Sequence, residues 1–197
     1  MAMVISGLKC CLAFTDDTIV FSSSFEQHMK DVQLLFGRFC LPKLKLKRIK
    51  CCLFQTECEF LGYWVSAEGI EVQKMKAACI QVWAFPKNIH ELLAFLGLCS
   101  YYWTYVKNFA AIAVPLMQCL QKGVALENTE KRVKAFEKLK VALMDAQILG
   151  VPHDDPLCKW VVDSDVSSHV AEAFLQQWQD GKLRVIEYAS PVFNRAE

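Results

Sequence analysis

The fold of this chain is decided by the stretch Lys9-Cys-Cys-Leu-Ala-Phe-Thr-Asp-Asp-Thr-Ile-Val-Phe-Ser22. Two adjacent aspartates, Asp16 and Asp17, divide it into two apolar runs, 9–14 and 18–22, which we predict to be the paired strands of a hairpin. Two carboxylates on one hairpin tip repel each other unless a cation compensates them. The pair therefore has two interpretations. It fills a polar turn, since turns are rich in Asp, or it belongs to a metal site of the kind used in phosphoryl transfer.

A helix is expected directly after this hairpin. Ser23 and Glu26 have the spacing of a capping box, and Pro42 gives the helix an end. Apolar residues between them recur every three or four positions and predict one buried face: Phe25, Met29, Val32, Phe36 and Phe39.

A basic segment, 43–50, follows this helix, and five of its eight residues are Lys or Arg. Such a segment can follow the phosphates of a nucleic acid. It can equally be a solvated strand edge, where lysines prevent aggregation. The net charge of the whole chain is +1, so no general basic field points to nucleic acid or to an anionic membrane.

The composition is that of a folded protein from a reducing compartment. A hydrophobic fraction of 54% over 197 residues allows a core in one domain or in two small ones. None of the ten cysteines forms a C-x-x-C pair, so the spacing of a zinc site is absent. We expect reduced cysteines and an intracellular location, either cytoplasmic or nuclear. Apolar runs end well short of about 18 residues, so we expect no transmembrane helix and no membrane partner.

The apolar pattern becomes helical from Glu71 onward. Asn88 and Glu91 have the spacing of a second cap, and Thr129 can cap a last helix that buries Phe136. The first of these helices is predicted from an apolar stripe: Val72, Met75, Ala78 or Cys79, and Val82.

After Gly150 the pattern indicates strands. We predict three antiparallel strands, at 158–165, 169–177 and 183–188, with a hairpin turn at 179–182. The fold class is therefore α+β.

The order of these pieces resembles the polyproteins of long-terminal-repeat retroelements, most closely the Ty3/gypsy-like reverse transcriptases with their ribonuclease H. Phe14-Thr-Asp-Asp17 resembles the aromatic-x-Asp-Asp turn of the polymerase palm, and Lys50-Cys51 resembles the end of the next palm motif. Further motifs follow in the family's order along nearly all of the chain: Phe60-Leu-Gly62, Trp83-Ala-Phe-Pro86, Leu93-Ala-Phe-Leu-Gly-Leu98, Ala113-Val-Pro-Leu116, Asp163-Ser-Asp165 and Tyr188-Ala-Ser190.

The resemblance implies three parts. Residues 1–70 would form a partial palm, with part of its sheet and one helix. Residues 71–148 would form thumb-like or connection-like helices. Residues 149–197 would form a truncated ribonuclease H-like domain that begins with a three-stranded antiparallel sheet.

The resemblance also implies catalytic and metal-binding roles. Asp16 and Asp17 would be two of three carboxylates that hold the polymerase metal ions, and Lys50 would give a proton to the leaving group. Asp165 would be the first of the carboxylates that hold two metals in a ribonuclease H site. The implied cofactor is Mg²⁺, with Mn²⁺ as the alternative ion, wherever these sites are completed.

Other residues would contact nucleic acid. Phe60, Leu61 and Gly62 match the primer grip, where a glycine allows the backbone to approach the primer end closely. The implied partner is an RNA–DNA hybrid or a primer–template, and another chain could complete the palm. Four basic residues would bind phosphates: Lys43, Lys45, Lys47 and Arg48.

In this family a third polymerase carboxylate lies on an earlier strand, and further ribonuclease H carboxylates follow the third strand. We therefore expect both sites to be incomplete. The implied function is that of a reverse transcriptase/ribonuclease H fragment, inactive alone, from an RNA-directed DNA polymerase and hybrid nuclease. The alternatives are a non-catalytic remnant that binds nucleic acid or protein, or the product of a decayed element without a selected function.

Overall fold

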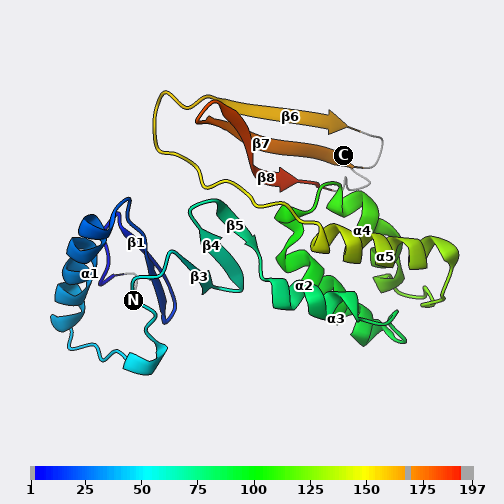
Figure 1. Ribbon diagram of the computed structural model, residues 1–197. Helices are drawn as coiled ribbons and strands as arrows, with labels where there is room; N and C mark the ends of the chain where they lie inside the picture. The colour runs from blue at the N-terminus through cyan, green and yellow to red at the C-terminus, as the bar shows by residue number, and fades with distance from the viewer. Residues whose placement is uncertain (1–2, 167–169, 192–197) are drawn as a thin grey trace. The chain divides into compact units, whose positions relative to one another are not determined.

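The structure is a computed structural model that describes residues 3–166 and 170–191, without the side chains of Lys74, Lys76 and Ala77. It divides into two compact units, unit 1 (Met1–Ala67) and unit 2 (Glu68–Glu197). Helices and antiparallel sheets are mixed along the chain (Figure 1), which confirms the α+β class. No helix in the described part of the chain is long and apolar enough to cross a membrane.

Unit 1 begins with the predicted hairpin, built from β1 (Cys11–Phe14) and β2 (Asp17–Val20). The helix α1 (Phe25–Cys40) follows it. Its N-cap is Ser24, whose hydroxyl accepts a hydrogen bond from the Gln27 backbone N–H at 3.2 Å, so the predicted cap at Ser23 was wrong by one position. The hairpin, the helix and the segment before β1 share a small core of four residues: Ile5, Cys11, Leu35 and Phe39.

The predicted buried face of α1 is only partly correct. Val32 and Phe39 are buried as expected, but Phe25, Met29 and Phe36 are exposed. A two-stranded sheet covers a narrow area, and the helix turns Leu35 and Asp31 toward it instead. Unit 1 therefore keeps several apolar side chains on its surface.

The second half of unit 1 contains one more hairpin, made of β3 (Glu57–Phe60) and β4 (Tyr63–Ser66). The basic segment before it is not a strand. Its only regular element is the short 3₁₀ turn η1 (Arg48–Lys50). Residues 51–56 form a loop.

The first part of unit 2 is helical. The core of these helices consists of side chains that are almost fully inaccessible, among them Leu92, Phe95, Leu116, Phe136 and Leu139. The strand β5 (Gly69–Val72) leads into the helices. They are α2 (Lys74–Gln81), α3 (Ile89–Tyr101), η2 (Trp103–Tyr105), α4 (Phe109–Met117), η3 (Gln118–Leu120) and α5 (Glu130–Met144).

The predicted cap of α3 is confirmed. Asn88 accepts from the Glu91 backbone N–H at 2.9 Å, and the Glu91 carboxylate accepts from the Lys87 N–H at 2.9 Å. The apolar stripe predicted for α2 was wrong, because Met75, Cys79 and Val82 are exposed and Ile80 is the buried residue. Val72 is buried as well, but in a strand.

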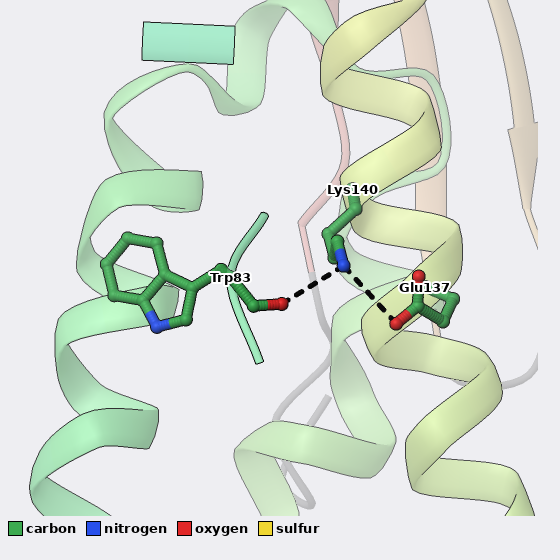
Figure 2. Close-up of polar contacts among 3 residues, drawn as sticks. All are labelled: Trp83, Glu137 and Lys140. Atoms are coloured by element: carbon green, nitrogen blue, oxygen red, sulfur yellow. Dashed lines mark hydrogen bonds and ion pairs between the residues drawn. The ribbon is translucent and has the colours of Figure 1, made fainter. Parts of the chain in front are cut away.

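A buried cation holds the last helix to an earlier segment. The Lys140 ammonium donates to the Trp83 carbonyl at 3.1 Å and lies 3.4 Å from the Glu137 carboxylate (Figure 2). It also lies 5.1 Å from the centre of the Phe136 ring. Burying an ammonium is costly unless it is paired and hydrogen-bonded, and here it joins α5 to the connection between α2 and α3.

Unit 2 ends in the predicted three-stranded antiparallel sheet, β6 (Trp160–Val166), β7 (Ala171–Gln179) and β8 (Lys182–Ala189), with β7 in the middle. The β7–β8 turn is the predicted one, since Asp180 and Gly181 both have positive φ (49° and 73°) as a tight hairpin requires. The start of the second strand, predicted at residue 169, lies partly outside the described residues.

Candidate functional site

The two aspartates lie at the tip of the first hairpin. Phe14 pairs with Asp17, so Thr15 and Asp16 make the loop. Both carboxylates are exposed to solvent. Thr15 has φ 51°, a left-handed conformation that is unfavourable for a β-branched residue. The tip is therefore held in a strained shape that exposes two adjacent carboxylates.

We expect Thr15→Gly to stabilise unit 1 by about 1 kcal/mol, because glycine adopts a positive φ without strain. Native-state hydrogen exchange of the β1 and β2 amides in the full chain measures this. The control is Ala13→Gly, which places glycine in the neighbouring strand and should destabilise it by about 0.5–1 kcal/mol. Equal losses in both variants would mean that the turn carries no strain.

A polar network lies where β2 leads into α1, and sequence reasoning missed it. The Ser22 hydroxyl donates to the Asp31 carboxylate at 2.6 Å, and the Gln27 amide donates to the same carboxylate at 2.9 Å. These two hydrogen bonds hold the pKa of Asp31 below its usual range, and the one from Ser22 has the larger effect. His28 Nδ1 lies 3.3 Å from the Ser22 hydroxyl. The only signal in the sequence was the four-residue spacing of Gln27 and Asp31.

This network lines an open groove of about 570 Å³ in unit 1. Its other lining residues come from the segment before β1, from the residues just after β2 and from α1; they include Lys9, Cys10, Phe21 and Leu34. The network joins the segment that leaves the hairpin to α1.

Lys50 lies at the end of η1 and is exposed, as are all residues from 40 to 50. Among the described residues, no hydrogen bond or ion pair joins Lys50 to Asp16 or Asp17. The structure thus places the basic segment on the surface of unit 1, with its ammonium groups in solvent.

The three residues that resemble the primer grip lie together at the tip of the second hairpin. Phe60 pairs with Tyr63, and Leu61 and Gly62 form the two-residue loop between them. Both loop residues have positive φ, 51° for Leu61 and 77° for Gly62. Such turns select glycine, so Gly62 fits its position whereas Leu61 is strained.

Asp165 lies on β6, where its carboxylate accepts from the Val166 backbone N–H at 2.9 Å. It stands directly opposite Glu172 on β7. Asp163, two residues earlier on the same face, accepts a hydrogen bond from the Gln176 amide at 2.5 Å. Two carboxylates opposite each other are destabilising without a counter-charge. We could not predict from the sequence that Asp165 lies opposite Glu172, because that pairing depends on the register of the β6–β7 hairpin.

A metal site is not completed by the described residues. They contain no group of three or more His, Cys, Asp or Glu side chains that could hold a metal ion. Mg²⁺ can bind through one or two carboxylates while keeping several waters, and the exposed Asp16 and Asp17 offer oxygen ligands of this kind. Two-metal chemistry requires further ligands that bridge or flank both ions.

The order of the parts indicates a class of protein. An exposed Asp-Asp hairpin, a helix, a second tight hairpin, several packed helices and an antiparallel sheet follow one another as expected for a reverse-transcriptase-like chain with a ribonuclease H-like part. Residues 129–197 match the model of the RNase H-like domain found in reverse transcriptase.

Known proteins with similar sequences make the relationship specific. A retrovirus-related Pol polyprotein from transposon 297 of Drosophila melanogaster is 35% identical over 170 residues, which cover 86% of this chain and 16% of that protein. The corresponding protein of transposon opus, from the same organism, is 31% identical over 202 residues, which cover 96% of this chain and 20% of that protein. The Tf2-3 polyprotein of Schizosaccharomyces pombe is 27% identical over 187 residues, with 94% and 14% covered.

Solved structures share the fold. A foamy viral protease-reverse transcriptase in complex with double-stranded DNA aligns with a TM-score of 0.83 at 23% identity, over 100% of this chain and 34% of that chain. The complex with an RNA/DNA hybrid aligns with a TM-score of 0.81 at 23% identity, over 98% and 26%. The chain is thus related to the Pol polyproteins of gypsy-type and Tf2 retroelements, which confirms the resemblance seen in its sequence. It spans one fifth or less of the curated relatives' length.

Proposed function

We propose that this chain is the part of a retroelement reverse transcriptase that carries the Asp-Asp hairpin of the palm, the thumb-like or connection-like helices and the start of the ribonuclease H domain. The division at 1–70, 71–148 and 149–197 belongs to this proposal, as does an intracellular setting. The observation that carries it is the exposed Asp16–Asp17 pair on a strained turn.

In this proposal the aspartate pair binds Mg²⁺ or Mn²⁺, which when bound would activate the primer hydroxyl and neutralise the departing pyrophosphate. Lys50 gives a proton to the leaving group. Asp165 contributes the first ligand of the nuclease site. The Phe60–Gly62 tip positions the primer end on an RNA–DNA hybrid or primer–template.

The chain by itself is proposed to be inactive in both reactions, because neither carboxylate group reaches three ligands within the described residues. Another chain that completes the palm would supply the missing group. A non-catalytic role in nucleic-acid binding is favoured by one specific observation, the solvent exposure of Lys43, Lys45, Lys47 and Arg48. The remaining alternatives, a protein-binding remnant or a decayed product without a selected function, predict no nucleic-acid affinity.

The experiment combines activity with salt-dependent binding. We expect the full chain to bind an RNA–DNA hybrid with a logarithmic salt slope of about −2 or steeper, since each phosphate contact contributes about −0.7 to −0.9. Replacing Lys43, Lys45 and Lys47 by Gln should reduce the slope by up to about 2. No primer extension and no hybrid cleavage should occur in Mg²⁺ or Mn²⁺.

The matched control removes three other exposed lysines, Lys122, Lys159 and Lys182, so that the change in net charge is the same. A slope near zero for the unmodified chain would exclude phosphate binding. Primer extension that Asp16→Asn and Asp17→Asn both abolish would show that the chain is active alone, against the proposal.

A further inference from the structure

Three aromatic rings meet on the surface of unit 1. Phe25 lies in the first turn of α1, His28 lies one turn further on, and Phe54 comes from the loop before β3. The ring of Phe54 is 5.6 Å from that of Phe25 and 5.6 Å from that of His28, measured between centroids. Phe25 is 63% exposed and Phe54 is 47% exposed. The cluster therefore keeps much of its aromatic surface in solvent.

The backbone of Phe54 is strained. Its φ is 58°, in the left-handed region that bulky residues avoid. Such a conformation is energetically costly and persists only when the surroundings impose it. Because the Phe54 ring is about half exposed, its burial offsets little of this conformational cost. The strain therefore indicates a functional role for the ring rather than a role in packing.

His28 is fixed from the other side. Its Nδ1 lies 3.3 Å from the Ser22 hydroxyl, which in turn donates to the buried Asp31 carboxylate. The polar network thus holds one ring of the cluster, and the Phe54 ring packs against it in an edge-on arrangement at 75°. The three rings form a platform that is built in advance of any ligand.

The basic segment leads directly to this platform. Between Val32 and Thr56 the chain has six Lys or Arg residues and no Asp or Glu. This stretch leaves the last turn of α1 and returns to its first turn, where Phe54 meets Phe25. A helix of 16 residues is about 24 Å long, so positive charge extends over a distance that includes several phosphates of a nucleic-acid strand.

We propose that this surface binds single-stranded nucleic acid, with an unpaired base stacked on the Phe54 platform and the adjoining phosphates on the 43–50 segment. Aromatic side chains next to a basic groove are the usual elements of single-strand binding, because every base has a face that can stack. A duplex hides those faces within its own stack. The inference rests on the proposed nucleic-acid role for its phosphate contacts, but it requires neither metal ions nor catalysis.

The test separates stacking from charge. Fluorescence anisotropy compares the full chain's affinity for a thymidine oligomer of about 15 nucleotides with that for an abasic oligomer of equal length. We expect the thymidine oligomer to bind about 5-fold to 150-fold more tightly. Phe54→Gly should lose this preference while its affinity for the abasic oligomer stays unchanged. Glycine fits the positive φ, so this variant keeps its backbone without strain.

Two further variants keep the test sharp. Phe54→Trp, which retains a large ring, should keep the preference, as should Trp160→Leu, which removes an exposed aromatic side chain from unit 2. Two results overturn the stacking site: equal binding of the two oligomers, or a preference for the thymidine oligomer that survives in Phe54→Gly. If the abasic oligomer still binds in a salt-dependent way, the phosphate contacts of the proposed function stand. Absence of binding to both oligomers overturns the nucleic-acid role as well.

Two further comparisons test whether the ligand is a duplex or a membrane surface instead. Tighter binding of a duplex of equal length contradicts a single-strand site. An anionic membrane surface attracts lysines too, so vesicles of phosphatidylcholine and phosphatidylserine are included as a competitor. If the vesicles bind more tightly than the thymidine oligomer, and if Phe54→Gly weakens that binding, the platform is a membrane contact and the proposal is wrong.

Discussion

Gly69→Ala is expected to destabilise unit 2 by about 3 kcal/mol or more. A Cβ atom at this position would lie 2.2 Å from the carbonyl oxygen of Leu149 and 3.1 Å from its carbonyl carbon. The φ of Gly69 is +139°, which L-residues rarely adopt. Neither conflict is easily relieved, because the Leu149 backbone exchanges two hydrogen bonds of 2.9 Å with Ile70.

The loss should extend beyond β5, because three segments meet at this point. Beside the Ile70–Leu149 bridge, the Gly150 N–H donates to the Val185 carbonyl at 2.8 Å, and the Arg184 guanidinium donates to the Glu68 carbonyl at 2.9 Å. The start of the helical part is thereby tied to β8. Displacing the Leu149 carbonyl disturbs all of these contacts.

Urea denaturation of the full chain, followed by circular dichroism and by tryptophan fluorescence, measures the effect. The matched control is Gly97→Ala on the exposed side of α3, where nothing lies within 4 Å of the new Cβ. Alanine in a helix should raise stability there by about 0.5–1 kcal/mol. A Gly69 variant that unfolds within about 1 kcal/mol of the unmodified chain would contradict the close approach.

Elements with local causes could be predicted from the sequence. The Asp16–Asp17 hairpin, the Asn88–Glu91 cap and the Asp180–Gly181 turn each depend on side chains within four residues of one another. The α+β class and most of the elements were predicted as well, because turn residues and apolar periods mark where strands and helices begin and end.

Features decided by distant contacts could not be predicted. The spacing in α1 allows two overlapping faces, and only the narrow β1–β2 hairpin decides that Leu35 is buried and Phe36 is exposed. The strand β5 was missed because it is only four residues long and one residue separates it from α2, so its apolar residue Val72 falls in phase with the helical period. Val72 therefore looked like the first residue of a helical stripe.

The candidate site shows the same division. The position of Asp16 and Asp17 at a hairpin tip and of Asp165 near a strand end was predicted, because charge in an apolar context is visible in a sequence. The chemical roles of these residues stay predictions. The neighbours of those residues were not visible. Asp31 beside Ser22, Glu172 opposite Asp165 and Phe54 against Phe25 all require the fold to be known.

Phe136→Ala is expected to destabilise unit 2 by about 3–5 kcal/mol, as large-to-small changes of fully buried aromatic residues do. Phe136 is fully buried in α5, with its ring centroid 4.4 Å from that of Phe95 and 5.4 Å from that of Phe85. Alanine would leave a cavity at the centre of the helical core and remove the ring beneath the Lys140 ammonium. Urea denaturation measures the loss, with Val141→Ala on the exposed side of the same helix as the control, expected within about 0.5 kcal/mol of the unmodified chain. If the two variants unfold at the same urea concentration, the Phe136 side chain does not stabilise the helical core.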